Sequence, residues 1–296
     1  MYKFLYLIIM ATSYGQAVSD QTYMGAEATA LAGAIVSQQG SSESIFHNPA
    51  GLAGLDAIQF SAGGGNLYGF NWLPAYHLSG VLPLPGMGTM GIAVQQFETK
   101  HGDKVLSSEQ TFSIAQGFNL QQDKNSHLAM GFTANFIQWN LGKSAGVSGD
   151  GSDGFELGSL NSFTIDLGIR ASLREKYQFG AFIKNINSGA IGKGMSRQVL
   201  PKRINVGITY EPIPNLTTSI VAERLLGRED LQIKGAMRYR LNPFLDLYSG
   251  AQSNPSRLGF GFKLSIGELD GLTFTYGLLT HPVLPLMQQV SIGFKL

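Results

Sequence analysis

Long runs of alternating apolar and polar residues constrain the fold of this chain more than any other feature. In the segment 162–173 every second residue is Phe, Ile, Leu or Ala, and the residues between them are polar, charged or glycine. The segments 127–136, 203–210 and 258–266 alternate in the same way. Successive side chains of a strand point to opposite faces, so a period of two predicts amphipathic β-strands.

The length and the number of these runs favour a barrel in a membrane. Several runs have about 9–12 residues, the length of a tilted membrane strand, whereas strands of soluble sheets usually have about 5–6. We count about fourteen runs, and an even number is typical of bacterial outer-membrane barrels. They begin near Ala57, Ala75, Met87, Glu109, His127, Asn161, Tyr177, Arg203, Leu216, Leu231, Phe244, Leu258, Leu272 and Gln288.

The connections between the runs alternate in length. "LREKYQ", "YEPIPNLT" and "YRLNPFLD" are tight, whereas the segments 140–161 and 186–203 are long. Short turns at one end and long loops outside the cell are typical of outer-membrane barrels. Tyrosine and tryptophan near run ends are expected to form interfacial girdles; they are Trp139, Tyr177, Tyr210, Tyr239 and Tyr248. We therefore predict an all-β fold, a transmembrane antiparallel β-barrel of about 14 strands, with a soluble all-β protein as the alternative.

Composition excludes several other classes of protein. Lys and Arg number 21 against 20 Asp and Glu, without the basic stripe of a nucleic-acid-binding protein. The absence of cysteine excludes a disulfide scaffold and Cys-ligated metal sites. Beyond the N-terminus no segment is apolar for 18 residues, so a helical membrane protein is not expected.

The first 17 residues have the pattern of a signal peptide. Lys3 precedes an apolar run from Phe4 to Met10, and small residues occupy the cleavage positions at Gly15 and Ala17. An anchor helix is the alternative, but this run is far shorter than the roughly 20 residues that span a bilayer. We predict export with cleavage after Ala17.

Residues 18–56 differ from the rest of the chain. Small residues at helical spacing are followed by a break at Gly40, and Asn48 precedes a proline, which disfavours helix and favours a turn. Gly51 and Gly54 permit close approach of backbone. We expect this segment to form a short luminal plug, or hatch, containing some helix, and residues 57–296 to form the barrel.

The N-terminal segment carries a resemblance to a known family. Gly25-Ala26, Ala32-Gly33-Ala34 and the stretch "SIFHNPAGLA" from Ser44 resemble the N-terminal signature of the PorV/PorQ family, outer-membrane barrels related to the fatty-acid transporter family FadL. "AFIKNIN", "PKRINVGITYEP" and "AQSNPSRLGFGFKL" are similar to its Bacteroidota branch. The resemblance implies a fourteen-stranded barrel with a luminal hatch. Its plug or gate motif would comprise Phe46, Asn48, Pro49, Gly51 and Leu52.

Two functions follow from the resemblance. The PorV/PorQ type implies a non-enzymatic accessory of type IX protein secretion, with secretion components or exported cargo as partners. The FadL type implies a channel for long-chain fatty acids or other hydrophobic small molecules. Both imply the bacterial outer membrane, its lipid and the barrel assembly machinery; Phe294 would serve as the insertion signal in place of a terminal aromatic residue. Inward faces rich in Gly, Ser, Thr and charge, with Phe182 as an exception, disfavour a large apolar tunnel.

Charged residues recur on the polar faces of the strands. Asp166 and Arg170 share one face of one strand, and Glu223 can meet Lys234 or Arg238 on the next strand. A charge in a tight lumen needs a partner. We therefore expect these residues and Lys184 to form ion pairs that hold a packed lumen shut, rather than a permeation path.

The residues that enzymes and metal sites require are not arranged for those roles. The five histidines are scattered without an HExxH pattern, and no GxSxG motif occurs. "GDGSDGFE" at residues 149–156 lacks the spacing of an EF-hand, so a solvated loop is favoured over a calcium site. We expect neither catalysis nor a metal or other cofactor.

Overall fold

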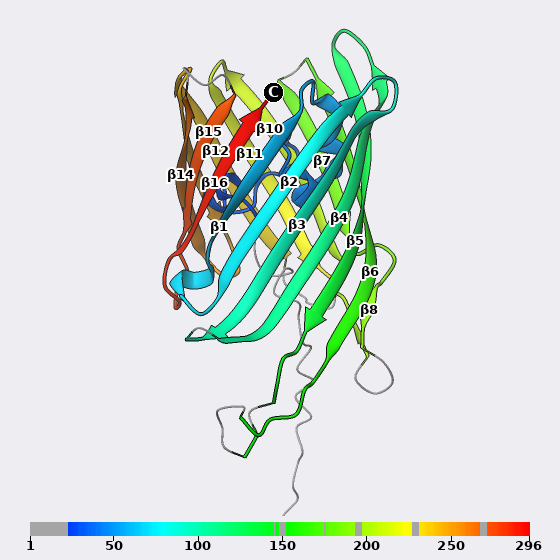
Figure 1. The fold of residues 1–296 in the computed structure, drawn as a ribbon. Coiled ribbons are helices and arrows are strands. Elements are labelled where there is room, and N and C mark those ends of the chain that lie inside the picture. Colours follow the sequence, from blue (N-terminus) through cyan, green and yellow to red (C-terminus); the bar gives the residue numbers. More distant parts are fainter. Residues whose placement is uncertain are drawn as a thin grey trace, which may run out of the picture.

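The chain forms a closed antiparallel barrel in this computed structural model (Figure 1). The structure describes residues 23–102, 104–144, 146–147, 152–174, 176–192, 197–226, 231–266 and 271–296. The predicted signal peptide lies outside these residues, as do Gly149 to Gly151 of the acidic loop. No helix in the described part of the chain is long and apolar enough to cross a membrane.

Fourteen of the described strands make the wall. They are β1 (Gln59–Asn66), β2 (Pro74–Leu84), β3 (Gly88–His101), β4 (Lys104–Gln122), β5 (Ser126–Asn140), β6 (Ser159–Leu173), β7 (Tyr177–Lys184), β10 (Arg203–Ile213), β11 (Leu216–Leu225), β12 (Leu231–Asn242), β13 (Leu245–Gln252), β14 (Arg257–Ile266), β15 (Leu272–Leu279) and β16 (Met287–Lys295). The predicted transmembrane barrel of about 14 strands is confirmed. A two-stranded ribbon, β8 (Ala190–Ile191) with β9 (Gln198–Val199), lies in the connection between β7 and β10.

Pairing of the first and last strands closes the sheet. Gln59 lies opposite Lys295, and the register continues to Asn66 opposite Gln288. Closure satisfies the backbone groups that an open edge would leave unpaired in lipid. The predicted strand starts lie close to those in the structure, except that β4 begins at Lys104, before the predicted Glu109, because its hairpin with β3 continues beyond the rest of the wall.

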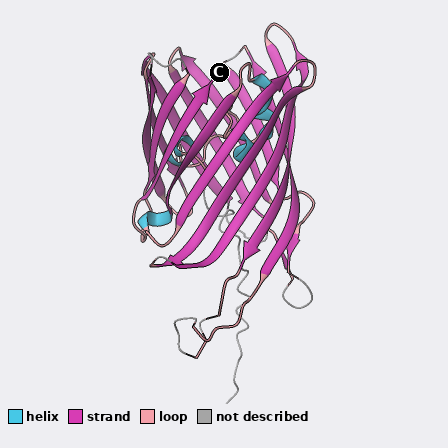
Figure 2. Cartoon of the chain, in the orientation of Figure 1, coloured by secondary structure: helices cyan, strands magenta, loops and turns pink. Residues whose placement is uncertain are grey.

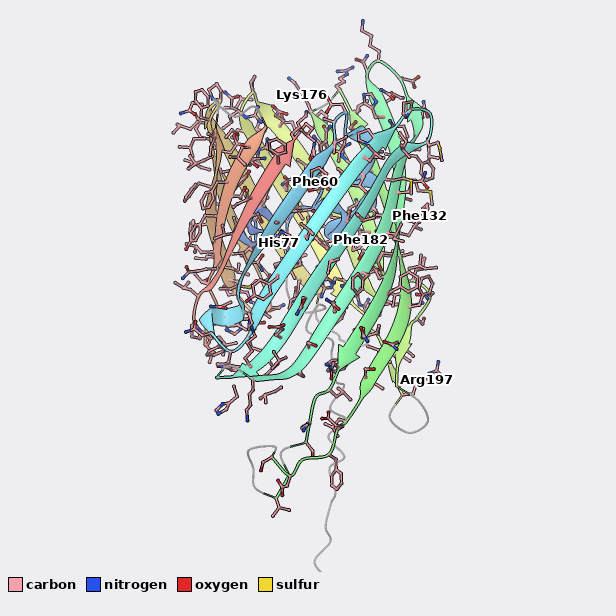
Figure 3. All side chains as sticks on the ribbon, viewed as in Figure 1. Phe60, His77, Phe132, Lys176, Phe182 and Arg197 are labelled. Atoms are coloured by element: carbon pink, nitrogen blue, oxygen red, sulfur yellow. The ribbon has the colours of Figure 1, made fainter. Side chains whose placement is uncertain are left out.

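Side chains alternate strictly across the wall. In β2, His77, Ser79 and Val81 are buried, and Tyr76 and Leu78 between them are exposed. The exposed apolar side chains form a belt around the outside, which in a bilayer contacts lipid. Members of this belt include Phe60, Ile92, Phe112, Ile114, Phe132, Phe136, Phe163, Ile169, Ile208, Ile220, Ile233 and Phe260. Figure 3 shows Phe60 and Phe132 of this belt together with Phe182, which is buried in the lumen.

The two ends of the barrel differ as the loop lengths predict. β6 ends and β7 begins at the end that carries the C-terminus, as do the short turns 214–215 and 243–244; β5 ends and β6 begins at the opposite end, as do the end of β7 and the start of β10 (Figure 1). Since long loops of such barrels face outward, we name these the periplasmic and the extracellular end.

The expected aromatic girdle is only partly present. Tyr177 and Tyr210 stack with their ring centroids 5.0 Å apart on the outer face, and Tyr239 is also exposed. Tyr248 and Trp139 instead occupy inward positions, and Tyr248 is buried against the plug. The prediction for these two was wrong because position near a strand end does not determine the face; the parity of the residue along the strand does.

The N-terminal segment lies inside the barrel, where Figure 2 shows its helices enclosed by strands. It contains α1 (Ala26–Ala30), α2 (Ser44–His47) and the 3₁₀ helix η2 (Pro49–Gly54), and a further 3₁₀ helix η3 (Leu67–Gly69) follows β1. α1 contacts β14, β15 and β16, while η2 contacts β3 to β6. We call residues 23–56 the plug.

Glycines on the inner face of the wall make room for the plug. A Cβ atom at Gly277 would overlap the carbonyl oxygen of Ala26, and one at Gly131 would overlap the backbone of Pro49. A Cβ atom at Gly117, Gly180, Gly250 or Gly259 would likewise overlap plug backbone, and one at Gly168 would overlap the side chain of Asn48. The high glycine content of the strands therefore reflects close packing of helix backbone on sheet backbone.

Candidate ligand site in the plugged lumen

Asn48 fastens the middle of the plug. It precedes Pro49, and its extended backbone ends α2 and leaves the side chain free to cap η2, where Oδ1 accepts a hydrogen bond from Ala50 N at 3.1 Å. Nδ2 donates to Val36 O at 2.7 Å and to Ile169 O of the wall at 3.2 Å. One buried amide thus joins two plug segments and the barrel.

Glu43 fastens the plug to another part of the wall, at β1 and β2. Its Oε1 accepts from Ser61 Oγ at 2.6 Å and lies 3.1 Å from His77 Nε2, while Ser79 Oγ donates to Ser42 Oγ at 3.0 Å. Burial alone would raise the pKa of Glu43, but the hydrogen bonds and charge of His77 and the hydrogen bond from Ser61 lower it to about 2. The carboxylate is therefore ionised at physiological pH.

The remaining motif residues pack rather than bind. Leu52 and Ile45 are buried against inward side chains of β2, β3 and β4. A Cβ atom added to Gly51 would lie 3.4 Å from Gly40 N. A larger residue at this position would therefore push two plug segments apart. The structure brings all five predicted motif residues together inside the barrel.

The predicted charges lie in the lumen, with partners that the sequence only partly identified. Lys234 is completely buried and pairs with Glu223 at 2.6 Å, as one of the two predicted alternatives requires. Arg203, which the sequence did not single out, lies 3.7 Å from the same carboxylate. The ammonium of Lys234 also lies 4.6 Å from the ring centroid of Tyr23 in the plug.

Arg238 and Asp166, two other residues of the predicted charge set, have partners other than Glu223 and Lys234. Arg238 lies 3.4 Å from Asp246 and 4.0 Å from Glu27 of α1, rather than beside Glu223. Asp166 accepts from Asn135 Nδ2 at 2.8 Å and from Asn185 N at 2.7 Å.

Arg170 lies on the same face of β6 as Asp166 but extends toward the plug. It donates to Ser37 O of the plug at 3.4 Å and to Gln178 Oε1 at 3.1 Å. The two residues share one face, as predicted, but their side chains have different partners. Arg170 contacts the plug, and Asp166 contacts residues of the barrel.

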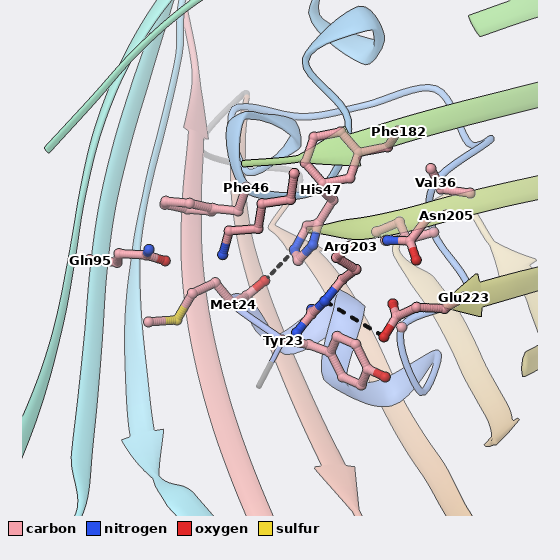
Figure 4. A pocket seen from close by; sticks show the side chains of 13 residues that line it. Tyr23, Met24, Val36, Phe46, His47, Gln95, Phe182, Arg203, Asn205 and Glu223 are labelled. Carbon is pink, nitrogen blue, oxygen red and sulfur yellow. Dashed lines mark hydrogen bonds and ion pairs between the residues drawn. The ribbon is translucent and has the colours of Figure 1, made fainter. Parts of the chain in front are cut away.

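A first cavity lies beside the plug (Figure 4). Its apolar lining includes Phe46, Ile35 and Phe182, and its polar lining includes Lys184 and Arg203. The remaining lining residues are Tyr23, Met24, Gly33, Val36, His47, Gln95, Asn205 and Glu223. His47 Nε2 donates to Met24 O at 2.6 Å, which closes one side of this cavity.

A second cavity adjoins the first. Both are lined by Phe46, Gln95 and Lys184, and the second adds apolar Ile45, Ile137 and Leu200. The free volumes are only about 30 Å³ and about 20 Å³, room for one or two water molecules each. A larger occupant of these two cavities therefore requires side chains or the plug to move.

Several apolar residues on the inner face were not anticipated. Phe182 was expected, but Phe97, Ile137, Val221 and Leu279 also point inward and are buried. Each has the inward parity of its strand, so a residue-by-residue assignment of faces would have found them. They make the lumen more apolar than its glycine and serine content indicates.

Two other predicted features were placed but not tested. Phe294 lies near the end of β16 on the outer face, opposite Phe60 and Leu272, and its role in insertion stays a prediction. In the acidic loop, Asp153 accepts from Val147 N at 3.0 Å, and Glu156 lies 3.3 Å from Lys143. Within the described ranges no group of three His, Cys, Asp or Glu side chains could hold a metal ion.

Known structures share this fold over nearly the whole chain. The toluene transporter TbuX of Ralstonia pickettii superposes with a TM-score of 0.61 at 13% identity, covering 92% of this chain and 98% of that one. The toluene transporter TodX of Pseudomonas putida gives 0.62 at 14% identity, covering 92% and 98%. A FadL homologue of Pseudomonas aeruginosa gives 0.56 at 9% identity, covering 91% and 98%.

These similarities establish the fold, which is that of FadL-type outer-membrane barrels. No protein-family model matches the sequence, and no curated protein matches it. The resemblance to PorV/PorQ and to the Bacteroidota branch has no support from these comparisons.

Proposed function

We propose that this protein is a channel through which small hydrophobic molecules cross the outer membrane. The observation that carries the proposal is the plugged lumen, in which a separate N-terminal segment fills the barrel and borders cavities lined in part by apolar side chains. The barrels of the same fold include two toluene transporters and a FadL homologue. The low sequence identity leaves the transported compound open.

The second candidate is the secretion accessory. It rests on the resemblance of residues 25–53 to the PorV/PorQ signature, and the comparisons favour the channel instead. Native mass spectrometry of the protein extracted gently from the outer membrane of its own host distinguishes the two. Bound secretion components or exported cargo would favour the accessory, and a barrel carrying only lipid or hydrophobic small molecules would favour the channel.

A reversible lock on the plug tests the channel directly. Ser42 of the plug and Ser79 of β2 are buried with their Oγ atoms 3.0 Å apart, and the chain has no cysteine. The double variant Ser42→Cys with Ser79→Cys therefore introduces one thiol pair at a distance suited to a disulfide. Cells of a Gram-negative host that express it are supplied with radiolabelled toluene and radiolabelled oleate.

We expect the unmodified protein to raise uptake of at least one probe above that of cells without it. Oxidation of the double variant should abolish this gain, and a reducing agent should restore it. The single-cysteine variants serve as controls that oxidation leaves unchanged. Equal uptake by the oxidised and reduced double variant, or no uptake of either probe by the unmodified protein, would contradict the proposal.

A further inference from the structure

A groove on the outer face of the barrel lies at its periplasmic end, where β4 to β7 and β10 are neighbours. Lys176, labelled in Figure 3, marks the turn beside it. Its free volume of about 320 Å³ is far larger than the about 30 Å³ and about 20 Å³ of the luminal cavities. Its apolar lining consists of Leu128, Ala171, Leu173, Tyr177, Phe179 and Ile208.

Three polar residues of the lining belong to the inner face of the wall. His127 lies opposite Ser172, and Ser172 lies opposite Gln178, so the three share one face of the sheet. That face is the inner one, because Ser172 is buried. These residues therefore border the groove with their backbone. The polar side chains of the lining that lie on the outer side are those of Gln121 and Ser126.

Ala171 accounts for the hollow. In one row across the outer face, Leu128 of β5 lies opposite Ala171, Ala171 opposite Phe179 of β7, and Phe179 opposite Ile208 of β10. The other three side chains of this row are large. A methyl group cannot fill the space between its larger neighbours, so a gap remains above it. One small residue in a row of large ones therefore shapes the groove.

The groove begins at the level of the membrane interface. Tyr177, the first residue of β7, stacks on Tyr210 with ring centroids 5.0 Å apart. Such outward aromatic residues lie at the boundary between head groups and hydrocarbon. Ala171 and Phe179 are two residues farther from the periplasmic turn than Leu173 and Tyr177, which is about 7 Å along a strand. The groove therefore extends from the interface into the hydrocarbon layer.

Formal charge at the periplasmic rim of the groove is balanced. The β4–β5 and β6–β7 turns touch, since Arg174 N donates to Asn125 O at 2.6 Å, and Glu211 N of β10 donates to Lys176 O at 2.9 Å. In sequence, these segments contain as many basic as acidic residues: Lys124, Arg174 and Lys176 against Asp123, Glu175 and Glu211. The rim thus has no excess charge that would select an anionic or a cationic ligand.

We propose that this groove binds one acyl chain of a phospholipid of the periplasmic leaflet, and that the chain is recognised rather than the charge of the head group. The groove is continuous with the belt of exposed apolar side chains, which lipid contacts. It also opens at the level where the chains of that leaflet begin. The site lies outside the lumen, so it is independent of the proposed channel.

Native mass spectrometry of the full chain tests this site. The protein in detergent micelles is mixed with equal amounts of a phosphatidylethanolamine and a phosphatidylglycerol that have the same acyl chains. We expect one phospholipid to remain on each barrel, with the two head groups represented within about twofold of each other. A photoreactive group near the end of the chain should cross-link to the segment 171–179.

Ala171→Phe should fill the groove and reduce the lipid-bound fraction by about tenfold. Ala251→Phe is the matched control, because Ala251 is an exposed alanine on the outer face of β13, and it should retain the lipid. Ala171→Leu should give an intermediate fraction and serves if the phenylalanine variant does not fold. Heat-dependent gel migration shows which variants are folded.

The site is refuted if the unmodified protein retains no phospholipid, or if Ala171→Phe retains as much as Ala251→Phe. A lipid that survives Ala171→Phe and cross-links to the plug would lie in the lumen and would equally refute the groove. Dimers that Ala171→Phe dissociates would show that a second copy of the chain covers this face instead. Strong preference for one head group would overturn recognition by the chain.

Discussion

Single polar side chains hold the plug, and Asn48 shows why residue type matters there. Its amide satisfies a plug carbonyl, a wall carbonyl and a plug N–H at once. Serine is too short to span these groups, and aspartate lacks the two N–H donors. The sequence placed Asn48 in a turn because proline follows it, but only the fold supplies the carbonyl of Ile169 from the wall.

Asn48→Ala should loosen the plug. The substitution leaves the buried carbonyl groups of Val36 and Ile169 without this donor, at a cost of about 1–3 kcal/mol. We expect a lower midpoint of unfolding in detergent and more frequent opening in planar bilayers. Asn119→Ala, which removes an amide at the rim with a longer 3.4 Å contact to Ala53 O, is the control. Equal stability of the two variants would contradict the role assigned to Asn48.

Glu43 predicts how the closed state depends on pH. Because its pKa is lowered from 4.5 to about 2, the carboxylate is fully ionised above about pH 4.5, and the stability that it contributes as a hydrogen-bond acceptor, as from Ser61 Oγ, is lost as the pH falls through about 2. Bilayer conductance should therefore stay low and constant from about pH 8 to pH 5. Glu43→Gln should raise it over this whole range. An opening transition of the unmodified protein between pH 5 and 7 would contradict this assignment.

At the scale of strands, the inward glycines contact the plug, and the outward apolar residues face the lipid. The periodicity of the sequence identified the two faces of each strand, since alternation is local. It could not show that glycines of β14 and β15 lie under α1, because that contact joins residues more than 200 positions apart. The wall is therefore shaped to the plug, strand by strand.

Gly277→Ala should strain this contact. Its methyl group would overlap Ala26 O, so we expect a loss of about 1–3 kcal/mol and a displaced plug. Gly235→Ala is a matched control in β12, where the added atom has only Ser219 O at 4.0 Å. Denaturant titration and protease accessibility of the plug would compare the two. Equal behaviour of both variants would show that the plug does not need the glycine.

The belt of exposed apolar side chains predicts that the loss of folding free energy caused by a charged substitution depends on the depth of that residue in the membrane. Ile220 lies near the middle of β11, and Ile213 lies at the periplasmic end of β10; both are exposed. Ile220→Arg should cost about 2–4 kcal/mol of folding free energy in bilayers, and Ile213→Arg about 0–1. Folding titrations in lipid vesicles measure both. Equal costs would mean that the belt does not match the lipid core.

At the scale of the whole molecule, the plug fills the lumen of the barrel. The inner wall has glycine, serine and charged side chains whose partners include the plug residues Glu27, Glu43 and Ser37. Without the plug these groups would face water, and the lumen would open. The closed state thus belongs to the complete chain and not to the barrel alone.

Deletion of residues 18–54 should convert the protein into an open pore. We expect single-channel conductance in planar bilayers to rise well above that of the intact protein, because the segment that fills the lumen is gone. Circular dichroism and heat-dependent gel migration must first show a folded barrel. If the folded deletion variant conducts as little as the intact protein, other side chains close the lumen.

The sequence by itself determined the barrel, its approximate strand number, the alternation between two faces along each strand and the separate character of the segment before the first strand. These follow from period two, strand length and turn composition, which act between neighbours along the chain. Only the tertiary structure decided the partners of Arg238, the contact between Asn48 and Ile169 O, and the two cavities at Phe46. Those depend on the closure and register of the barrel, which bring together residues that no local pattern connects.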